Sequence, residues 1–128
     1  MTDIQEVLLD EDQLSARVKE LGKEISKDYA DGDLMLLGIL KGSVIFLADL
    51  VRAISIPVDM DFMAVSSYGA GTETSGQVRV LKDLEDSIEG RDILIVEDII
   101  DSGLTLSYLI ETLKSRNPRS VRVVVLLD

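Results

Sequence analysis

The segment with the clearest chemical potential runs from Ile93 to Thr105, where an apolar stretch ends in acidic residues. Glu97 and Asp98 directly follow the aliphatic residues 93–96, so a buried strand would deliver two adjacent carboxylates to its carboxyl end. Burying two such groups without partners is costly, which favours a role in binding. Carboxylates in this position could accept hydrogen bonds from the diol of a sugar.

The turn that follows these acids has the composition of an anion-binding loop. Gly103 lets the backbone approach a ligand closely, and Ser102 and Thr105 offer hydroxyl groups. The first-turn N–H groups of the next helix would point out of the helix, as phosphate binding requires. Asp-Ser-Gly between a strand and a helix is also ordinary capping chemistry, and the tripeptide alone would more often be that.

Composition limits the other kinds of chemistry. The chain has 128 residues, the size of one domain, and no Cys or His, which excludes thiol nucleophiles, His-dependent triads and ordinary zinc sites. A metal would be a hard cation on oxygen ligands, for which Mg²⁺ fits best, and a general base must be Asp, Glu, Lys or Tyr. The net charge of −11 argues against nucleic-acid binding.

Nothing in the sequence indicates a membrane protein. The acidic N-terminus is not a signal peptide, and the apolar stretches are too short to span a bilayer, so a cytoplasmic protein is expected.

Hydrophobic periodicity predicts the elements that must position the acidic segment. Helical spacing predicts a helix from about Glu11 to Tyr29, with Asp12 as a possible cap, and two more helices. Continuous aliphatic stretches predict strands buried on both faces. Beyond the first helix, the predicted elements are a strand over 34–40, a helix over 44–54, strands over 58–65, 77–84 and 92–100, a helix over 104–116 and a strand over 121–127, with a polar loop over 66–76.

Together these elements predict one α/β domain over residues 1–128, Rossmann-like, with a mostly parallel sheet and helices on both faces. The sequence stops at Asp128, directly after a strand, and we expect further residues to follow in a longer protein.

The segment Ile93–Thr105 resembles the 5-phosphoribosyl-pyrophosphate (PRPP) signature of type I phosphoribosyltransferases. That signature reads apolar residues, two acids, two apolar residues, Asp, Ser or Thr, Gly, any residue and Thr. Leu40-Lys41-Gly42 is similar to the pyrophosphate loop of hypoxanthine-guanine enzymes, and Ser66-Ser67-Tyr68-Gly69 to their mobile lid. The three matches, in this order, cover nearly the whole chain after the first helix.

The resemblance implies a role for each matching residue, and these roles are expectations. The loop residues Asp101, Ser102, Gly103, Leu104 and Thr105 would bind the 5′-phosphate of PRPP or of the nucleotide. Glu97 and Asp98 would hold the ribose hydroxyls, partly through Mg²⁺, and Asp101 would be the general base or proton relay for N7 of the purine. Lys41 and Gly42 would contact pyrophosphate, and Ser67 and Tyr68 would belong to the lid.

The implied reaction is Mg²⁺-dependent purine salvage, in which PRPP and hypoxanthine or guanine give IMP or GMP and pyrophosphate. A homo-oligomer, dimer or tetramer, is also implied. Three alternatives stay open: a nucleotide-sensing regulator of the same fold, a transferase for adenine, xanthine or orotate, and a fragment that binds PRPP without turnover. The net charge argues against an RNA-binding regulator.

Overall fold

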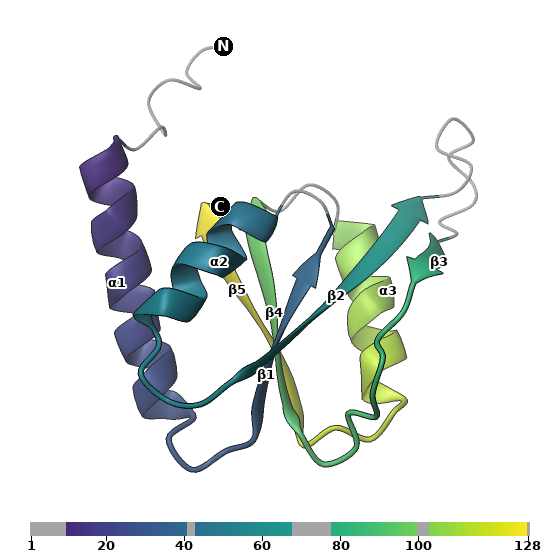
Figure 1. Cartoon of the computed structure of the whole chain (residues 1–128). Coiled ribbons are helices and arrows are strands. Elements are labelled where there is room, and N and C mark those ends of the chain that lie inside the picture. Colours follow the sequence, from purple (N-terminus) through teal and green to yellow (C-terminus); the bar gives the residue numbers. More distant parts are fainter. Residues whose placement is uncertain (1–9, 41–42, 68–77, 100–102, 128) are drawn as a thin grey trace.

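The computed structural model describes residues 10–40, 43–67, 78–99 and 103–127, which form one sheet flanked by helices (Figure 1). The elements in chain order are α1 (Glu11–Asp28), β1 (Leu34–Ile39), α2 (Val44–Ala53), β2 (Asp59–Ser67), β3 (Val78–Lys82), β4 (Asp92–Ile99), α3 (Gly103–Lys114) and β5 (Ser120–Leu127). Every predicted element is present within a few residues of its predicted bounds.

The five strands are ordered β3-β2-β1-β4-β5. All neighbouring pairs are parallel except β2 and β3, which are antiparallel. The predicted α/β fold with a mostly parallel sheet is therefore confirmed. No helix in the described part of the chain is long and apolar enough to cross a membrane.

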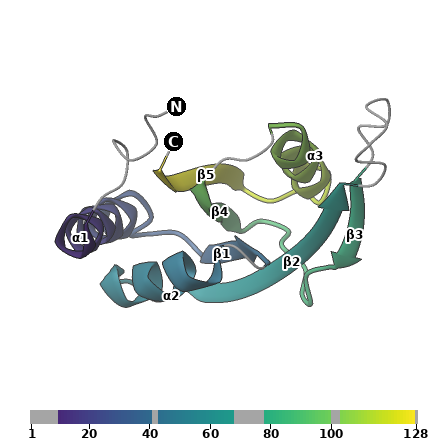
Figure 2. The same cartoon turned by 90° about the horizontal axis from the view of Figure 1, so that it is seen from above.

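The central strands β1 and β4 are buried because α1 and α2 lie on one side of the sheet and α3 on the other (Figure 2). Successive side chains of a strand point to opposite faces. Leu36 and Leu94 therefore pack with α1 and α2, whereas Leu37 and Ile95 pack with α3. Aliphatic side chains fill both layers, which explains why the central strands read as continuous apolar stretches.

Helix α1 begins at Glu11 as predicted, but its N-cap lies two residues before the predicted one. Asp10, not Asp12, is the N-cap: its carboxylate accepts a hydrogen bond from the Gln13 N–H at 2.8 Å. The Gln13 side chain in turn accepts from the Asp10 N–H at 2.9 Å, completing a capping box. A capping box needs Glu or Gln three residues after the cap. Asp10 has Gln13 at that position, whereas Asp12 has Ser15, so Asp10 is the cap.

Strands β2 and β3 form an antiparallel arm whose extent differs from the prediction. Ser66 and Ser67 were expected to open a loop, but they continue β2 and pair with Arg79 and Val78 of β3. The pairing register shifts between Ala64 and Val65, which lets the arm bend away from the parallel sheet. Backbone pairing with β3 thus overrides the polar composition of these two serines.

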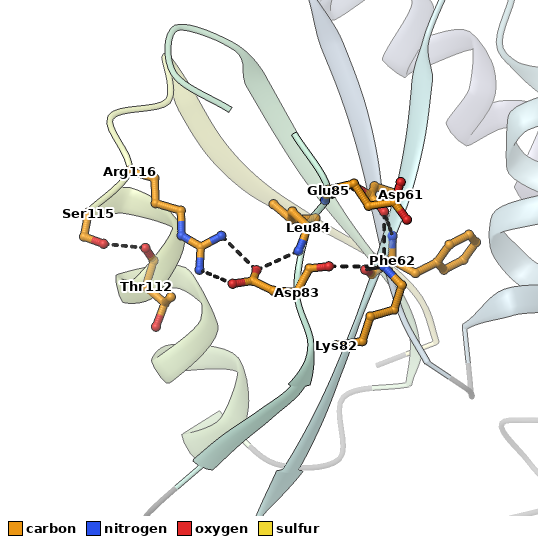
Figure 3. Close-up of polar contacts among 9 residues, drawn as sticks. All are labelled: Asp61, Phe62, Lys82, Asp83, Leu84, Glu85, Thr112, Ser115 and Arg116. Atoms are coloured by element: carbon orange, nitrogen blue, oxygen red, sulfur yellow. Dashed lines mark hydrogen bonds and ion pairs between the residues drawn. The ribbon is translucent and has the colours of Figure 1, made fainter. Parts of the chain in front are cut away.

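The base of this arm is tied to the core by ion pairs (Figure 3). Arg116, just beyond α3, donates two hydrogen bonds of 2.9 Å to the two carboxylate oxygens of Asp83. Asp61 on β2 accepts from the Glu85 N–H at 3.1 Å, and its carboxylate lies 3.6 Å from the Lys82 ammonium group. These contacts fix where the arm leaves the sheet.

Candidate functional site

The strand order reverses direction between β1 and β4. From β1 the chain passes through α2 to β2 on one side, and from β4 it passes through α3 to β5 on the other. In open parallel sheets, ligands bind in the crevice outside the carboxyl ends of the strands at such a switch point. The carboxyl ends of β1 and β4 and the amino ends of α2 and α3 lie at the same edge, uppermost in Figure 1.

The strands that precede or contain the two principal motifs are neighbours at this edge. Parallel pairing sets Gly38 of β1 beside Val96 of β4, close to the carboxyl ends of both strands. The two strands are thus side by side, although more than 50 residues separate their motifs in the sequence.

On the β4 side, Glu97 and Asp98 both lie in the strand near its carboxyl end. Glu97 is half-buried, and strand alternation places it on the face covered by α3, like Ile93 and Ile95. Gly103, Leu104 and Thr105 form the first turn of α3, which begins at Gly103 rather than at Leu104 as predicted. Asp101 and Ser102, also predicted for this site, lie outside the described residues.

The backbone at the start of α3 suits an anion. The first N–H groups of a helix have no partner within the helix, and the helix dipole makes this end positive. Because α3 begins immediately after the carboxyl end of β4, these donors lie next to the acidic end of that strand. A ligand that combines a phosphate with a diol matches both features.

On the β1 side, Lys41 and Gly42 lie outside the described residues, and Ser43 is the N-cap of α2. The Ser43 side chain is buried, with 1% of the residue exposed. Its hydroxyl donates to the Ile39 carbonyl at 2.9 Å and accepts from the Ile39 N–H at 3.0 Å. The sequence analysis did not single out Ser43. A small hydroxyl residue directly before a predicted helix was the feature that could have indicated it.

Of the two predicted lid residues, Ser67 lies at the end of the β2–β3 arm. Ser67 is the last residue of β2. Tyr68 lies outside the described residues. The tertiary structure thus brings the start of the polar segment to the end of a strand adjacent to β1, at the carboxyl edge of the sheet (Figure 1).

Two acidic residues of β4 could hold a metal at this edge. Among the described residues, no cluster of three or more potential metal-ligating side chains occurs. Glu97 and Asp98 supply hard carboxylate oxygens at the end of β4. This donor set suits Mg²⁺, which is commonly bound through one or two carboxylates together with substrate phosphates.

Two hollows in the described part of the chain lie at the opposite, amino edge of the sheet. One of about 300 Å³ is lined by residues that include Tyr29, Asp92 and Arg119, and one of about 220 Å³ by residues that include Asp59 and Arg91. Each hollow has a charged side chain that already bonds a neighbouring side chain: Asp92 accepts from the Ser120 hydroxyl, and Arg91 donates to Asp59. Topology and motifs both favour the switch point over these hollows as the functional site.

Comparison with known proteins agrees with this geometry. The model of the family described as "Phosphoribosyl transferase domain" matches residues 5–128. The hypoxanthine-guanine phosphoribosyltransferase of Mycobacterium avium is 56% identical over 131 residues, which cover 98% of this chain and 64% of the relative. That of Bacillus subtilis is 52% identical over 126 residues, which cover 98% of this chain and 70% of the relative.

A solved structure shares the fold closely. The crystal structure of a hypoxanthine phosphoribosyltransferase from Staphylococcus aureus superposes with a TM-score of 0.88 at 46% identity, covering 93% of this chain and 65% of that chain. The present chain thus spans about two thirds of the length of the proteins that it matches. With a family model matched over nearly all its residues, this chain belongs to the phosphoribosyltransferase family, and its relatives there are hypoxanthine-guanine enzymes.

Proposed function

We propose that the protein is a cytoplasmic purine-salvage enzyme that transfers the 5-phosphoribosyl group of PRPP to hypoxanthine or guanine. The products are IMP or GMP and pyrophosphate. One observation supports the proposal most: β1 and β4 are neighbours at the switch point, and in the sequence the pyrophosphate-loop-like segment follows β1 while the PRPP-like segment begins within β4. A substrate with phosphate at one end and pyrophosphate at the other needs two such segments side by side.

The amino end of α3 and the loop before it would hold the 5′-phosphate. Gly103, Leu104 and Thr105 contribute the first helical turn, and the family resemblance assigns Asp101 and Ser102 to the same loop. Helix-end N–H groups and a positive dipole stabilise a phosphate without a cluster of basic side chains. This mode of binding suits a chain whose net charge is −11.

Glu97 and Asp98 would hold the ribose hydroxyls from the end of β4. Displacement of pyrophosphate gives the ribose C1 a cationic, oxocarbenium-like character, with which neighbouring carboxylates are compatible. The bond from C1 to the purine nitrogen forms as the bond from C1 to the pyrophosphate oxygen breaks. The proton that the purine loses at N7 would pass to Asp101.

The leaving pyrophosphate would be met at the turn between β1 and α2. Lys41 and Gly42 are assigned there by resemblance, and Lys41 would offset part of the developing negative charge. Mg²⁺, when bound, supplies further charge neutralisation for the pyrophosphate oxygens. Ser67 and Tyr68 would contribute to a lid that keeps water from the reactive C1.

An assay of the intact protein with PRPP, Mg²⁺ and each purine base tests this function. Nucleotide and pyrophosphate should appear in equal amounts with hypoxanthine or guanine, and not with adenine or orotate. Binding of PRPP with no turnover of any base would instead favour the nucleotide-sensing regulator or the fragment that binds PRPP without turnover. The family relationship also favours a homo-oligomer, a dimer or tetramer, which analytical ultracentrifugation of the same protein would measure.

A further inference from the structure

The hollow of about 300 Å³ lies at the amino edge of the sheet, opposite the switch point. Three segments line it: the end of α1 with the turn to β1, the first residue of β4, and the start of β5. These segments meet at the lower edge of the molecule in Figure 1. All lining residues lie in the described part of the chain, and none belongs to the proposed PRPP site. The hollow is therefore a separate place at which a ligand could bind.

Tyr29 has a buried hydroxyl at this hollow. The residue is 8% exposed, and its hydroxyl oxygen has no hydrogen-bond partner among the described residues. Burial raises the pKa of Tyr29, so the hydroxyl is a protonated donor at neutral pH. The charges of Arg122, Asp92 and Asp28, which all line the hollow, also act on the pKa of this hydroxyl. A buried hydroxyl normally has a partner, so an unbonded one indicates that water or a ligand completes the site.

Charges of opposite sign reach the hollow from different elements. Arg119 and Arg122, at the start of β5, are positive and exposed. Asp28 and Asp31, at the end of α1 and in the turn after it, are negative and exposed, and the carboxyl end of the helix dipole adds to them. Lys27, in the last turn of α1, offsets part of that negative charge. Within the described ranges, Arg122, Asp28 and Asp31 make no ion pair.

The buried acid of the hollow, Asp92, is already used by the protein itself. Its carboxylate accepts from the Ser120 hydroxyl at 2.7 Å and lies 3.6 Å from the Arg119 guanidinium. Its other oxygen lies so close to Gly32 that a Cβ at that position would be 2.4 Å away. The groups left for a ligand are therefore the Tyr29 hydroxyl, the unpaired arginine and the two exposed acids.

We propose that this hollow binds a small zwitterion of the free amino-acid class. Its carboxylate would face Arg122 and the Tyr29 hydroxyl, and its ammonium group would face Asp28 and Asp31. A ligand with negative charge alone would be repelled by these two acids and by the buried Asp92 carboxylate. A ligand with positive charge alone would be repelled by the arginines and would give the hydroxyl no acceptor. The volume suits a small ligand, because sites for small molecules begin at about 300 Å³.

The first test needs no variant. Wild-type protein is titrated with each of the protein amino acids, and the backbone amide chemical shifts of Gly32 and Ser120 are followed. At least one amino acid should shift both signals saturably. Analogues of that amino acid without the ammonium group or without the carboxylate should bind roughly tenfold or more weakly, the contribution of a hydrogen bond to a charged group. No shift with any amino acid would mean that water alone occupies the hollow and would overturn the inference, as would equal affinity for either analogue.

The same titration in the presence of saturating PRPP and Mg²⁺ separates this site from the switch point. Amino-acid affinity should be unchanged, because the hollow lies at the other edge of the sheet. Competition by PRPP would place the amino acid at the switch point and overturn the inference. Protein that binds the amino acid but not PRPP would refute the proposed function and leave this inference standing.

Two variants then test the residues. Arg122→Gln should weaken amino-acid binding roughly tenfold or more, and Tyr29→Phe roughly three- to tenfold. Because Tyr29→Phe removes an unbonded hydroxyl, its unfolding free energy should not fall, whereas loss of a purely structural hydrogen bond would lower it. Arg52→Gln on α2 and Tyr108→Phe on α3 are matched controls at exposed positions and should bind as wild type. Wild-type affinity in either Arg122→Gln or Tyr29→Phe would overturn the inference.

Discussion

The two ends of the parallel sheet are built from different interactions. At the amino edge, charged side chains cross-link the strands: Arg91 donates to both Asp33 and Asp59 at 2.8 Å, and Asp92 accepts from the Ser120 hydroxyl at 2.7 Å. These contacts join β4 to the residues at the start of β1, β2 and β5.

At the carboxyl edge, the described contact is made by a neutral hydroxyl. The Ser43 side chain bonds the backbone of Ile39, and Glu97 and Asp98 belong to the last residues of β4. With the proposed ligand site at the carboxyl edge, the charged cross-links and the binding residues would lie at opposite ends of one sheet. Substitutions at the two edges should therefore affect different properties.

The largest effect is expected for Asp101→Asn. If Asp101 moves the proton of the purine, turnover should fall about 10²–10⁴-fold, while PRPP affinity and the unfolding midpoint stay as in wild type. Steady-state assays, PRPP titration and thermal unfolding of the same sample measure the three quantities. Asp86→Asn, an exposed acid at the amino edge, is the control and should be fully active. Unchanged turnover in Asp101→Asn would remove this residue from the mechanism.

Lys41→Met should weaken binding without weakening the fold. A hydrogen bond to a charged group contributes about 1.5–3 kcal/mol, so pyrophosphate affinity should fall roughly 10- to 150-fold. Isothermal titration in the presence of Mg²⁺ gives the affinity, and urea unfolding gives the stability. Lys23→Met, on the exposed side of α1, should change neither quantity. A comparable loss of stability in Lys41→Met would contradict the proposal that the two edges of the sheet affect different properties.

Asp92→Ala should show the reverse behaviour. Asp92 is buried, and its carboxylate accepts from Ser120 and lies 3.6 Å from the Arg119 guanidinium. Removing it leaves those groups without their partner, which costs about 1–3 kcal/mol of unfolding free energy. Urea unfolding should reveal this loss, and binding of ribose 5-phosphate by the folded variant should be normal. Glu89→Ala, an exposed acid, should leave the unfolding free energy within experimental error.

The smallest effect is expected for Arg116→Met, and it should depend on pH. The Arg116 hydrogen bonds are the main cause that holds the pKa of Asp83 below its usual value of 3.8, and Asp83 is about half exposed. The pair should therefore contribute no more than about 1 kcal/mol near pH 7.

The direction of the pH dependence follows from the lowered pKa. A carboxylate whose pKa is depressed by folding adds stability above its unfolded pKa, and that stability is lost as the pH falls through the folded value. Urea unfolding of wild type and Arg116→Met should thus differ at pH 7 and converge below about pH 4. A difference that grows in acid would show that Asp83 is not the partner responsible.

The sequence by itself determined the elements and the chemical inventory. Local periodicity identified the buried strands, and the acidic residues at the end of one strand, with the loop after them, predicted a site for a phosphate and a diol. These features are readable because side-chain alternation and helix spacing depend on neighbours a few residues away. Two predictions were wrong because of a hydrogen-bonded partner. Gln13 makes Asp10 rather than Asp12 the cap, and pairing with β3 makes Ser66 and Ser67 part of a strand rather than a loop.

Only the tertiary structure decided which elements are neighbours. The pairing of β1 with β4, and hence the switch point, joins segments far apart in the chain and depends on how the helices cover the sheet. The Arg91 contacts with Asp33 and Asp59 arise from the same packing. The bonding of Ser43 also depends on tertiary structure. Its hydroxyl could cap α2, but it bonds the end of β1 instead. Local sequence carries no record of that choice, since either bond satisfies the same side chain.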